Sequence, residues 1–187
     1  MTTSPKPVPA TPTIRPMVLI GLGLLIDLVD PALNGWDLLP DWAGWILVLI
    51  GTAVFARQLP SRGLMLTAAA GALVLSAALW PPASIDWLKD QDASVAWSCT
   101  LPAIAWAILY SLALSGLSRK DPGASFWWKY IAAMNAAAAV LPILVYGGGM
   151  ASLETFMFVL GWLGQLCATV FSFLHSRRDW ALVPQPA

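Results

Sequence analysis

The chain has 187 residues, of which 58% are hydrophobic and only 11% are charged, and its mean hydropathy is +0.71. Soluble domains carry about 25% charged residues, so this composition excludes an ordinary soluble protein and indicates an integral membrane protein. The formal net charge of zero offers nucleic acid no overall attraction, and the length leaves room for one helical bundle without a separate soluble domain.

Six apolar segments follow one another, each close to the 20 or so residues that a helix needs to cross about 30 Å of hydrocarbon. They are rich in Ala and Leu and lack the alternation of barrel strands. The sequence therefore predicts an all-α bundle of six transmembrane helices, a membrane domain over 14–176. The expected helices cover residues 14–30, 38–57, 63–80, 94–117, 126–146 and 153–174.

The ends of the chain are predicted to be tails. Residues 1–13 belong to a proline-rich start without an apolar core, which indicates a disordered tail and not a signal peptide. Residues 177–187 are predicted to form a second tail. We expect both tails to lie in the cytoplasm, because Lys and Arg concentrate in cytoplasmic loops.

The basic residues carry that orientation. Nine of the ten lie at one predicted face of the membrane, and Lys89 alone lies at the other. The acidic residues divide the opposite way, with eight of ten on the predicted outer face. The outer acidic residues are Asp27, Asp30, Asp37, Asp41, Asp86, Asp90, Asp92 and Glu154.

Tryptophan is expected mainly at the two membrane boundaries, as in an aromatic belt. The predicted outer belt is Trp36, Trp42, Trp45, Trp80, Trp87 and Trp97, and the inner belt is Trp127, Trp128 and Trp180. Trp106 and Trp162 fall deeper within the predicted helices. We expect these two to pack between helices.

The stretch DLVDPALNGWDLLPDWAGW, residues 27–45, turns the chain around between the first two predicted helices. Asp37 and Asp41 suit the start of the second helix, where the helix dipole favours negative charge. Asp30, which precedes Pro31, suits the start of a short interfacial helix. These three carboxylates therefore have structural explanations.

Asp27 lacks such an explanation, because a carboxylate in the last turn of the first helix is opposed by the dipole. If that helix continued, Asp27, Asp30 and Asn34 would share one face. One interpretation is that these residues, with Asp41, bind an ion or substrate in an outward-opening cavity. The alternative is that Asp27 reaches water or bonds a neighbouring helix, with Lys89 as a cationic partner.

Signatures of catalysis and of metal or cofactor binding are missing. His175, the only histidine, has no Cys or carboxylate at metal-binding spacing and is read as interfacial. Cys99 and Cys167 lie in apolar segments, where cysteine is typically a small buried hydrophobe. No catalytic residue, metal ligand or cofactor is predicted.

One short segment bears a resemblance. Leu39, Pro40, Asp41, Gly44 and Trp45, with Gly51 further on, resemble the LPDxxG-aromatic segment of a group of uncharacterised small bacterial multi-spanning membrane proteins. The resemblance covers about the first two helices. It implies a protein of the bacterial cytoplasmic membrane, with the acidic loop as the motif region, and it implies no activity.

Three classes of function follow. The leading hypothesis is a non-enzymatic scaffold or accessory subunit, with the lipid bilayer and a membrane protein as partners, because no reaction chemistry is visible. The alternative is a small cation- or proton-linked transporter that uses the outer aspartates. An intramembrane enzyme acting on lipid comes third, since Ser and Thr occur without a partnering His or Lys. Nucleic acid is not expected as a partner.

Overall fold

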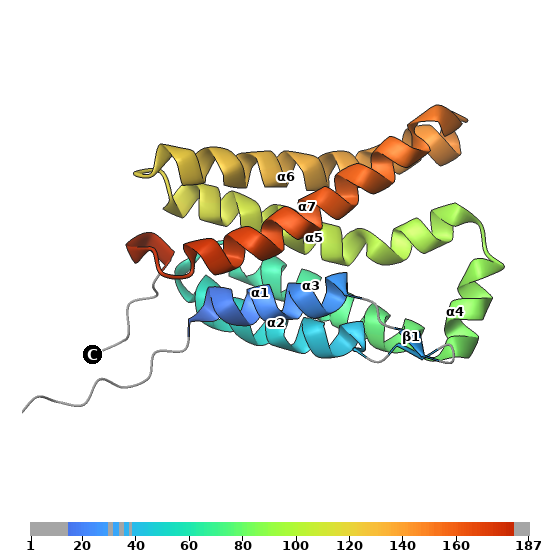
Figure 1. Ribbon diagram of the computed structural model, residues 1–187, viewed down its shortest axis with the longest axis horizontal. Coiled ribbons are helices and arrows are strands. Elements are labelled where there is room, and N and C mark those ends of the chain that lie inside the picture. The colour runs from blue at the N-terminus through green and yellow to red at the C-terminus, as the bar shows by residue number, and fades with distance from the viewer. Residues whose placement is uncertain (1–14, 30–31, 34–35, 38, 182–187) are drawn as a thin grey trace, which may run out of the picture.

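The computed structural model describes residues 15–29, 32–33, 36–37 and 39–181. The predicted tail over 1–13 and the last six residues of the predicted tail over 177–187 lie outside the described residues. Seven α-helices are described (Figure 1). They are α1 (Pro16–Leu28), α2 (Asp41–Phe55), α3 (Arg62–Leu79), α4 (Pro82–Lys89), α5 (Ala93–Leu117), α6 (Pro122–Pro142) and α7 (Glu154–His175).

Shorter elements join these helices. The 3-10 turns are η1 (Ala56–Gln58), η3 (Ala151–Leu153) and η4 (Asp179–Ala181), and η2 (Ile143–Gly147) is a π-helical turn that continues α6. The antiparallel two-residue strands β1 (Ala32–Leu33) and β2 (Trp36–Asp37) lie between α1 and α2. The six predicted helices correspond to α1, α2, α3, α5, α6 and α7, whereas α4 was not predicted.

Four helical segments of the described chain are long and apolar enough to cross a membrane. They are Arg62–Leu79, Ala93–Leu117, Pro122–Gly147 and Ala151–His175. The apolar helices α1 and α2 are shorter, at 13 and 15 residues. At 1.5 Å per residue each is about 20 Å long, less than the hydrocarbon thickness of about 30 Å.

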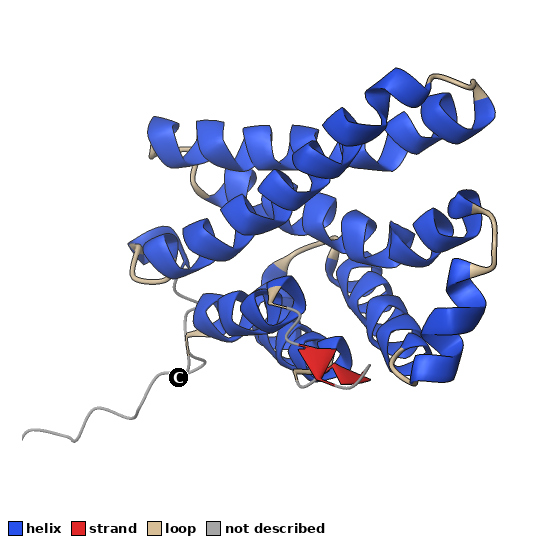
Figure 2. Cartoon of the chain, turned by 45° about the vertical axis from the view of Figure 1, so that its right-hand side comes forward, coloured by secondary structure: helices blue, strands red, loops and turns tan. Residues whose placement is uncertain are grey.

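The six helices other than α4 form a ring in which each packs mainly on two neighbours. Going round, α1 packs on α2, α2 on α3, α3 on α5, α5 on α6, α6 on α7, and α7 on α1 (Figures 1 and 2). The short helix α4 closes one end of the bundle between α3 and α5. We call this the α4 end, and the opposite end, where α1 begins and α7 finishes, the terminal end.

Large aromatic side chains fill the interior toward the terminal end. Trp106 and Tyr110 of α5 stack with ring centroids 4.8 Å apart, and Trp128 of α6 meets Tyr110 edge-on. All three rings are fully buried. The polar atoms of these rings are paired, because Trp106 Nε1 donates to Thr52 and Trp128 Nε1 donates to His175 Nδ1. This aromatic core packs side chains from α5 and α6 together in that half of the bundle.

Close contact between α1 and α2 depends on glycine. A Cβ added to Gly23 would collide with the backbone oxygen of Gly44, and one added to Gly44 would lie 2.5 Å from the oxygen of Gly23. A Cβ at Gly51 would lie 2.7 Å from Ile20. Small residues let helix backbones approach closely in this way where no hydrophobic force joins them in lipid.

The turn between α1 and α2 differs from the prediction. The α-helix ends at Leu28 with Val29 extended, so it does not carry Asp27, Asp30 and Asn34 on one face. The prediction of a short interfacial helix is wrong for the described residues of this turn, because β1 pairs there with β2. The helix α2 is capped by Pro40 and not by Asp37, which lies in β2.

Tryptophan and histidine at the expected boundaries are also more deeply buried than predicted. Trp45 is only 3% exposed and Trp128 is fully buried, so neither belongs to a boundary belt. His175 is 8% exposed and packs on Trp180 of η4, which makes it a core residue and not an interfacial one. Trp106 is buried as expected, but Trp162 is 55% exposed.

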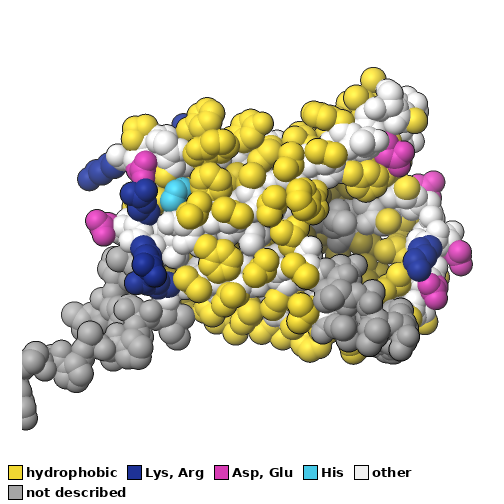
Figure 3. Space-filling view, in the orientation of Figure 1, with side chains coloured by type: hydrophobic (Ala, Val, Ile, Leu, Met, Phe, Trp, Pro, Cys, Tyr) yellow, Lys and Arg dark blue, Asp and Glu magenta, His cyan; other side chains and the backbone are white. Residues whose placement is uncertain are grey.

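Charge divides the described surface between the two ends. Lys and Arg gather at the terminal end, where some Asp or Glu side chains also lie, and further Asp and Glu side chains lie at the α4 end with Lys89 (Figure 3). A wide band of hydrophobic side chains lies between them. This distribution is typical of a protein that presents its two ends to water and its middle to lipid.

Candidate functional site

Asp27 lies in the last turn of α1 and bonds two other helices. Trp45 Nε1 of α2 donates to Asp27 Oδ1 over 2.9 Å, and Gln165 Nε2 of α7 donates to Asp27 Oδ2 over 2.8 Å. Both carboxylate oxygens therefore accept a hydrogen bond, and each retains a free lone-pair direction. The carboxylate ties α1, α2 and α7 together where the aromatic core gives way to open space.

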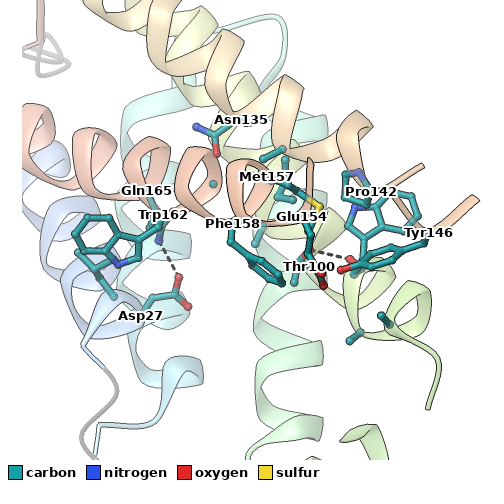
Figure 4. Close-up of a pocket in the computed structure, with 18 residues that line it drawn as sticks. Asp27, Thr100, Asn135, Pro142, Tyr146, Glu154, Met157, Phe158, Trp162 and Gln165 are labelled. Atoms are coloured by element: carbon teal, nitrogen blue, oxygen red, sulfur yellow. Dashed lines mark hydrogen bonds between the residues drawn. The ribbon is translucent and has the colours of Figure 1, made fainter. Parts of the chain in front are cut away.

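That space is a cavity of about 620 Å³ in the half of the bundle nearer the α4 end (Figure 4). Asp27 and Leu28 of α1 line it together with α5, α6, η2 and α7. The lining residues of α7 recur at three- and four-residue spacing, which places them on one helix face. They are Glu154, Met157, Phe158, Gly161, Trp162 and Gln165.

Several of the side chains that line the cavity from α5 and α6 are small and leave space at their positions. These are Ala93, Ala96, Thr100, Ala103 and Ala138. Further along α5, Trp106 and Tyr110 occupy the corresponding interior positions in the aromatic core. The sequence thus changes from small to large side chains along one helix, and the cavity ends where the aromatic rings begin.

The two ends of the cavity differ in depth. Asp27 and Gln165 lie at the end nearer the middle of the molecule, whereas Glu154, Pro142 and Tyr146 lie toward the α4 end (Figure 4). Gln165 and Glu154 are eleven residues apart on α7, which corresponds to about 16 Å along the helix. The carboxylate of Asp27 is therefore a deep group and that of Glu154 a peripheral one.

A second cavity of about 510 Å³ meets the first at Asp27. It lies among α2, α3, α4 and α5, and Asp41, Trp45 and Trp80 are among the residues that line it. Both cavities share Asp27, Ala96, Thr100 and Ala103. Asp27 and these three α5 residues thus line both cavities.

Asp27 has no cationic partner among the residues that the structure describes. No Lys or Arg lines either cavity in that part of the chain. Lys89, the partner considered from the sequence, instead pairs with Asp86 at 3.0 Å on the exposed surface of α4. The expectation that Asp27 hydrogen-bonds a neighbouring helix is confirmed by the bonds to Trp45 and Gln165. The expectation that Lys89 is its cationic partner is wrong.

The other predicted site residues have different outcomes. Asp41 is the first residue of α2 and lines the second cavity, so it shares a hollow with Asp27. Asp30 and Asn34 lie outside the described residues, and the structure does not test their predicted part in the site. Of the four candidates, the described chain brings together Asp27 and Asp41.

Several residues of the site were not assigned to it from the sequence. Trp45 was expected in a boundary belt and Glu154 only on the outer face, yet both line a cavity together with Asp27. Gln165 is 138 residues from Asp27 in the chain. Its amide, deep in an apolar helix, was the only sequence signal that could have marked it.

Trp97 offers an unused hydrogen-bond donor at the cavity. It lines the cavity from α5, and its indole Nε1 is buried without a partner in the described part of the chain. Buried polar atoms are paired in the great majority of cases. The Trp97 N–H is therefore an exception among the described residues.

The described residues contain no group of three His, Cys, Asp or Glu side chains that lie close enough together to hold a metal ion. His175 Nδ1 already accepts from Trp128 and lies at the terminal end, far along α7 from Asp27.

Comparison of the chain with protein-family models, with curated proteins and with solved structures finds no significant match.

Proposed function

We propose that the chain is a six-span membrane protein, with both termini in the cytoplasm, that binds a small cation at Asp27 from the outer side of the membrane. The cavity would be the binding site of a cation- or proton-linked transporter. Of the functions expected from the sequence, this one has a defined site. For a scaffold or accessory subunit, no surface of the described residues singles out a partner.

The observation that supports the site is the carboxylate of Asp27. It lies at the deep end of an apolar cavity, receives two N–H donors and faces no basic side chain of the described chain. An unpaired charge in such surroundings costs several kcal/mol. A bound cation would remove that cost by direct pairing with the free lone pairs of the carboxylate.

Charge distribution supports the topology. The basic residues of the described chain gather at the terminal end, and cytoplasmic loops are enriched in Lys and Arg. The four long helices would then cross the bilayer with α1 and α2 beside them in the ring. Local thinning of the bilayer can accommodate helices as short as these two, at a modest cost.

Thermal stability of the protein in lipid nanodiscs tests the cation site. Sodium, potassium, n-butylammonium and 4-phenylbutylammonium chlorides are compared at matched ionic strength, because binding to the folded state raises the melting temperature. At least one cation should stabilise the wild type saturably and leave Asp27→Asn unaffected. Asp90→Asn, which removes an exposed carboxylate at the same end, should respond like the wild type.

A second variant guards against misfolding of Asp27→Asn. Thr100 is exposed and lines both cavities, so Thr100→Phe should narrow the space while leaving Asp27 and its two donors in place. It should fold and respond more weakly than the wild type to 4-phenylbutylammonium, the largest of the four cations. The proposal fails if no cation stabilises the wild type, or if both variants respond as the wild type does.

A further inference from the structure

The cavity is far larger than an inorganic cation requires. Its volume of about 620 Å³ falls within the range of about 300 to 1,000 Å³ found for pockets that bind small organic molecules. Two carboxylates, of Asp27 and Glu154, are the charged groups that line it in the described chain. A ligand that fills this space must therefore match a negative site within a mainly apolar enclosure.

The surroundings of Asp27 do not suit a metal ion. Hard cations such as Ca²⁺ take six to eight oxygen ligands, roughly, but the nearest partners of this carboxylate are the N–H groups of Trp45 and Gln165. These N–H groups supply no oxygen ligands to a metal ion. An ammonium group needs only the free lone pairs of the carboxylate, to which it can donate.

Aromatic rings line the path from Asp27 toward the α4 end. Phe158 and Trp162 of α7 line the cavity, with exposed fractions of 61% and 55%, and Tyr146 of η2 lines its outer part. Such large exposed rings can cover an apolar ligand, and their faces attract cations. The cavity thus combines one deep carboxylate with aromatic walls above it.

From these features we infer that the ligand is an organic ammonium ion with an apolar, preferably aromatic, body. The ammonium group binds Asp27, and the body extends along α7 over Trp162 and Phe158. This inference rests on the proposed cation site and adds the class of ligand. The ammonium can belong to a free amine or to a lipid headgroup, because both present the same chemistry to the carboxylate.

Probes that differ in one feature test the ligand class. Tryptophan fluorescence measures the binding of 4-phenylbutylammonium to the protein in phosphatidylglycerol nanodiscs. The signal from nanodiscs that contain the Asp27→Asn variant is subtracted to correct for partition of the probe into lipid. The comparison probes are n-butylammonium, which lacks the ring, 4-phenylbutan-1-ol, which lacks the charge, and sodium and potassium ions. We expect 4-phenylbutylammonium to bind about tenfold more tightly than n-butylammonium. The alcohol should show no binding that depends on Asp27.

Matched substitutions test the aromatic wall. Phe158→Leu should weaken binding of 4-phenylbutylammonium about fivefold and leave that of n-butylammonium unchanged. Phe156→Leu removes a ring of similar exposure, 55%, from the same helix but outside the cavity lining, so it should change neither. Thr100→Phe, which narrows the cavity without altering a charge, should also weaken binding of 4-phenylbutylammonium.

The outcomes separate this inference from the proposed function. If n-butylammonium or an inorganic cation binds at Asp27 as tightly as 4-phenylbutylammonium, or if Phe158→Leu has no effect, the ligand class is wrong and the cation site stands. If no cation binds in an Asp27-dependent manner, both fail. Phosphatidylethanolamine that displaces the probe would identify a lipid headgroup as the source of the ammonium, and lack of displacement would identify a free amine.

Discussion

Trp45 donates a 2.9 Å hydrogen bond from its indole nitrogen to the carboxylate of Asp27, and so joins α2 to α1 at the deep end of the cavity. The same indole ring packs edge-on against Trp106, with centroids 5.7 Å apart. One side chain therefore links the candidate site to the aromatic core. Gln165 completes the arrangement from α7, so three helices meet at a single carboxylate.

Trp45→Phe removes the N–H donor and keeps an aromatic ring. A hydrogen bond to a charged group contributes about 1.5 to 3 kcal/mol, so we expect the free energy of unfolding to fall by roughly that amount. Denaturation by SDS in mixed micelles measures it. Trp87→Phe, at a side chain that is 54% exposed on α4, should have little effect. Equal loss in the two variants would mean that the Trp45 bond contributes nothing specific.

Gly44→Ala should separate α1 from α2. The added Cβ would lie 2.5 Å from the backbone oxygen of Gly23, and backbone cannot move aside as a flexible side chain can. Overpacking of this kind costs about 1 to 3 kcal/mol, which the same denaturation measures. Gly116→Ala is the control, because a Cβ added to Gly116 of α5 would meet nothing within 4 Å. A stable Gly44→Ala protein would contradict the close crossing.

Two tryptophans on α5 should respond differently to the same substitution. Trp106→Phe breaks the 3.0 Å bond to Thr52 and should lower the free energy of unfolding by about 1 kcal/mol or more. Trp97→Phe removes a buried N–H that has no partner in the described chain, so it should leave stability unchanged or raise it by about 1 kcal/mol. Destabilisation by both would show that Trp97 has a partner in the unliganded protein.

Asp92 caps α5, the helix whose first turns line the cavity. Its carboxylate accepts from the Ser94 backbone N–H over 2.8 Å, and hydrogen bonding by Ser94 lowers the pKa of this carboxyl below its usual value. The folded helix therefore favours the ionised form, so the cap is fully present above the ordinary pKa and is lost as the pH falls through the lowered one. Asp92→Ala should speed hydrogen exchange over 93–97 at neutral pH, whereas Asp90→Ala should not.

Cysteine labelling tests the proposed orientation. In a variant with Cys99→Ala and Cys167→Ala, a cysteine at Asp90 should react with a membrane-impermeant maleimide added outside intact cells. A cysteine at Arg177 should react only after the cells are opened. The reverse pattern would place the acidic α4 end in the cytoplasm and would remove the outward-facing cavity from the account.

Local pattern predicted much of the fold, because length and hydropathy are sufficient to locate long apolar helices. All six predicted segments overlap a helix of the ring. The short helix α4 was missed, since its eight residues, PASIDWLK, mix polar and apolar side chains and lie in a predicted loop. Its start at Pro82, after Pro81, is the local signal that could have found it.

The site was predictable only in part. Asp27 stood out because a carboxylate at that depth near a helix C-terminus has no local explanation, and its position at a cavity fits that prediction. Its partners depended on which helices become neighbours around the ring, and hydropathy carries no such information. The contact between α1 and α7 joins the two ends of the chain, so the bond from Gln165 could not be inferred from spacing.

The most direct test of the cation site is the stoichiometry of binding. Isothermal titration of 4-phenylbutylammonium into the protein in nanodiscs should give one site per chain in the wild type and in Asp90→Asn. In Asp27→Asn the heat should fall to that of empty discs. A full-strength site that survives Asp27→Asn would contradict the central claim that this carboxylate binds the cation.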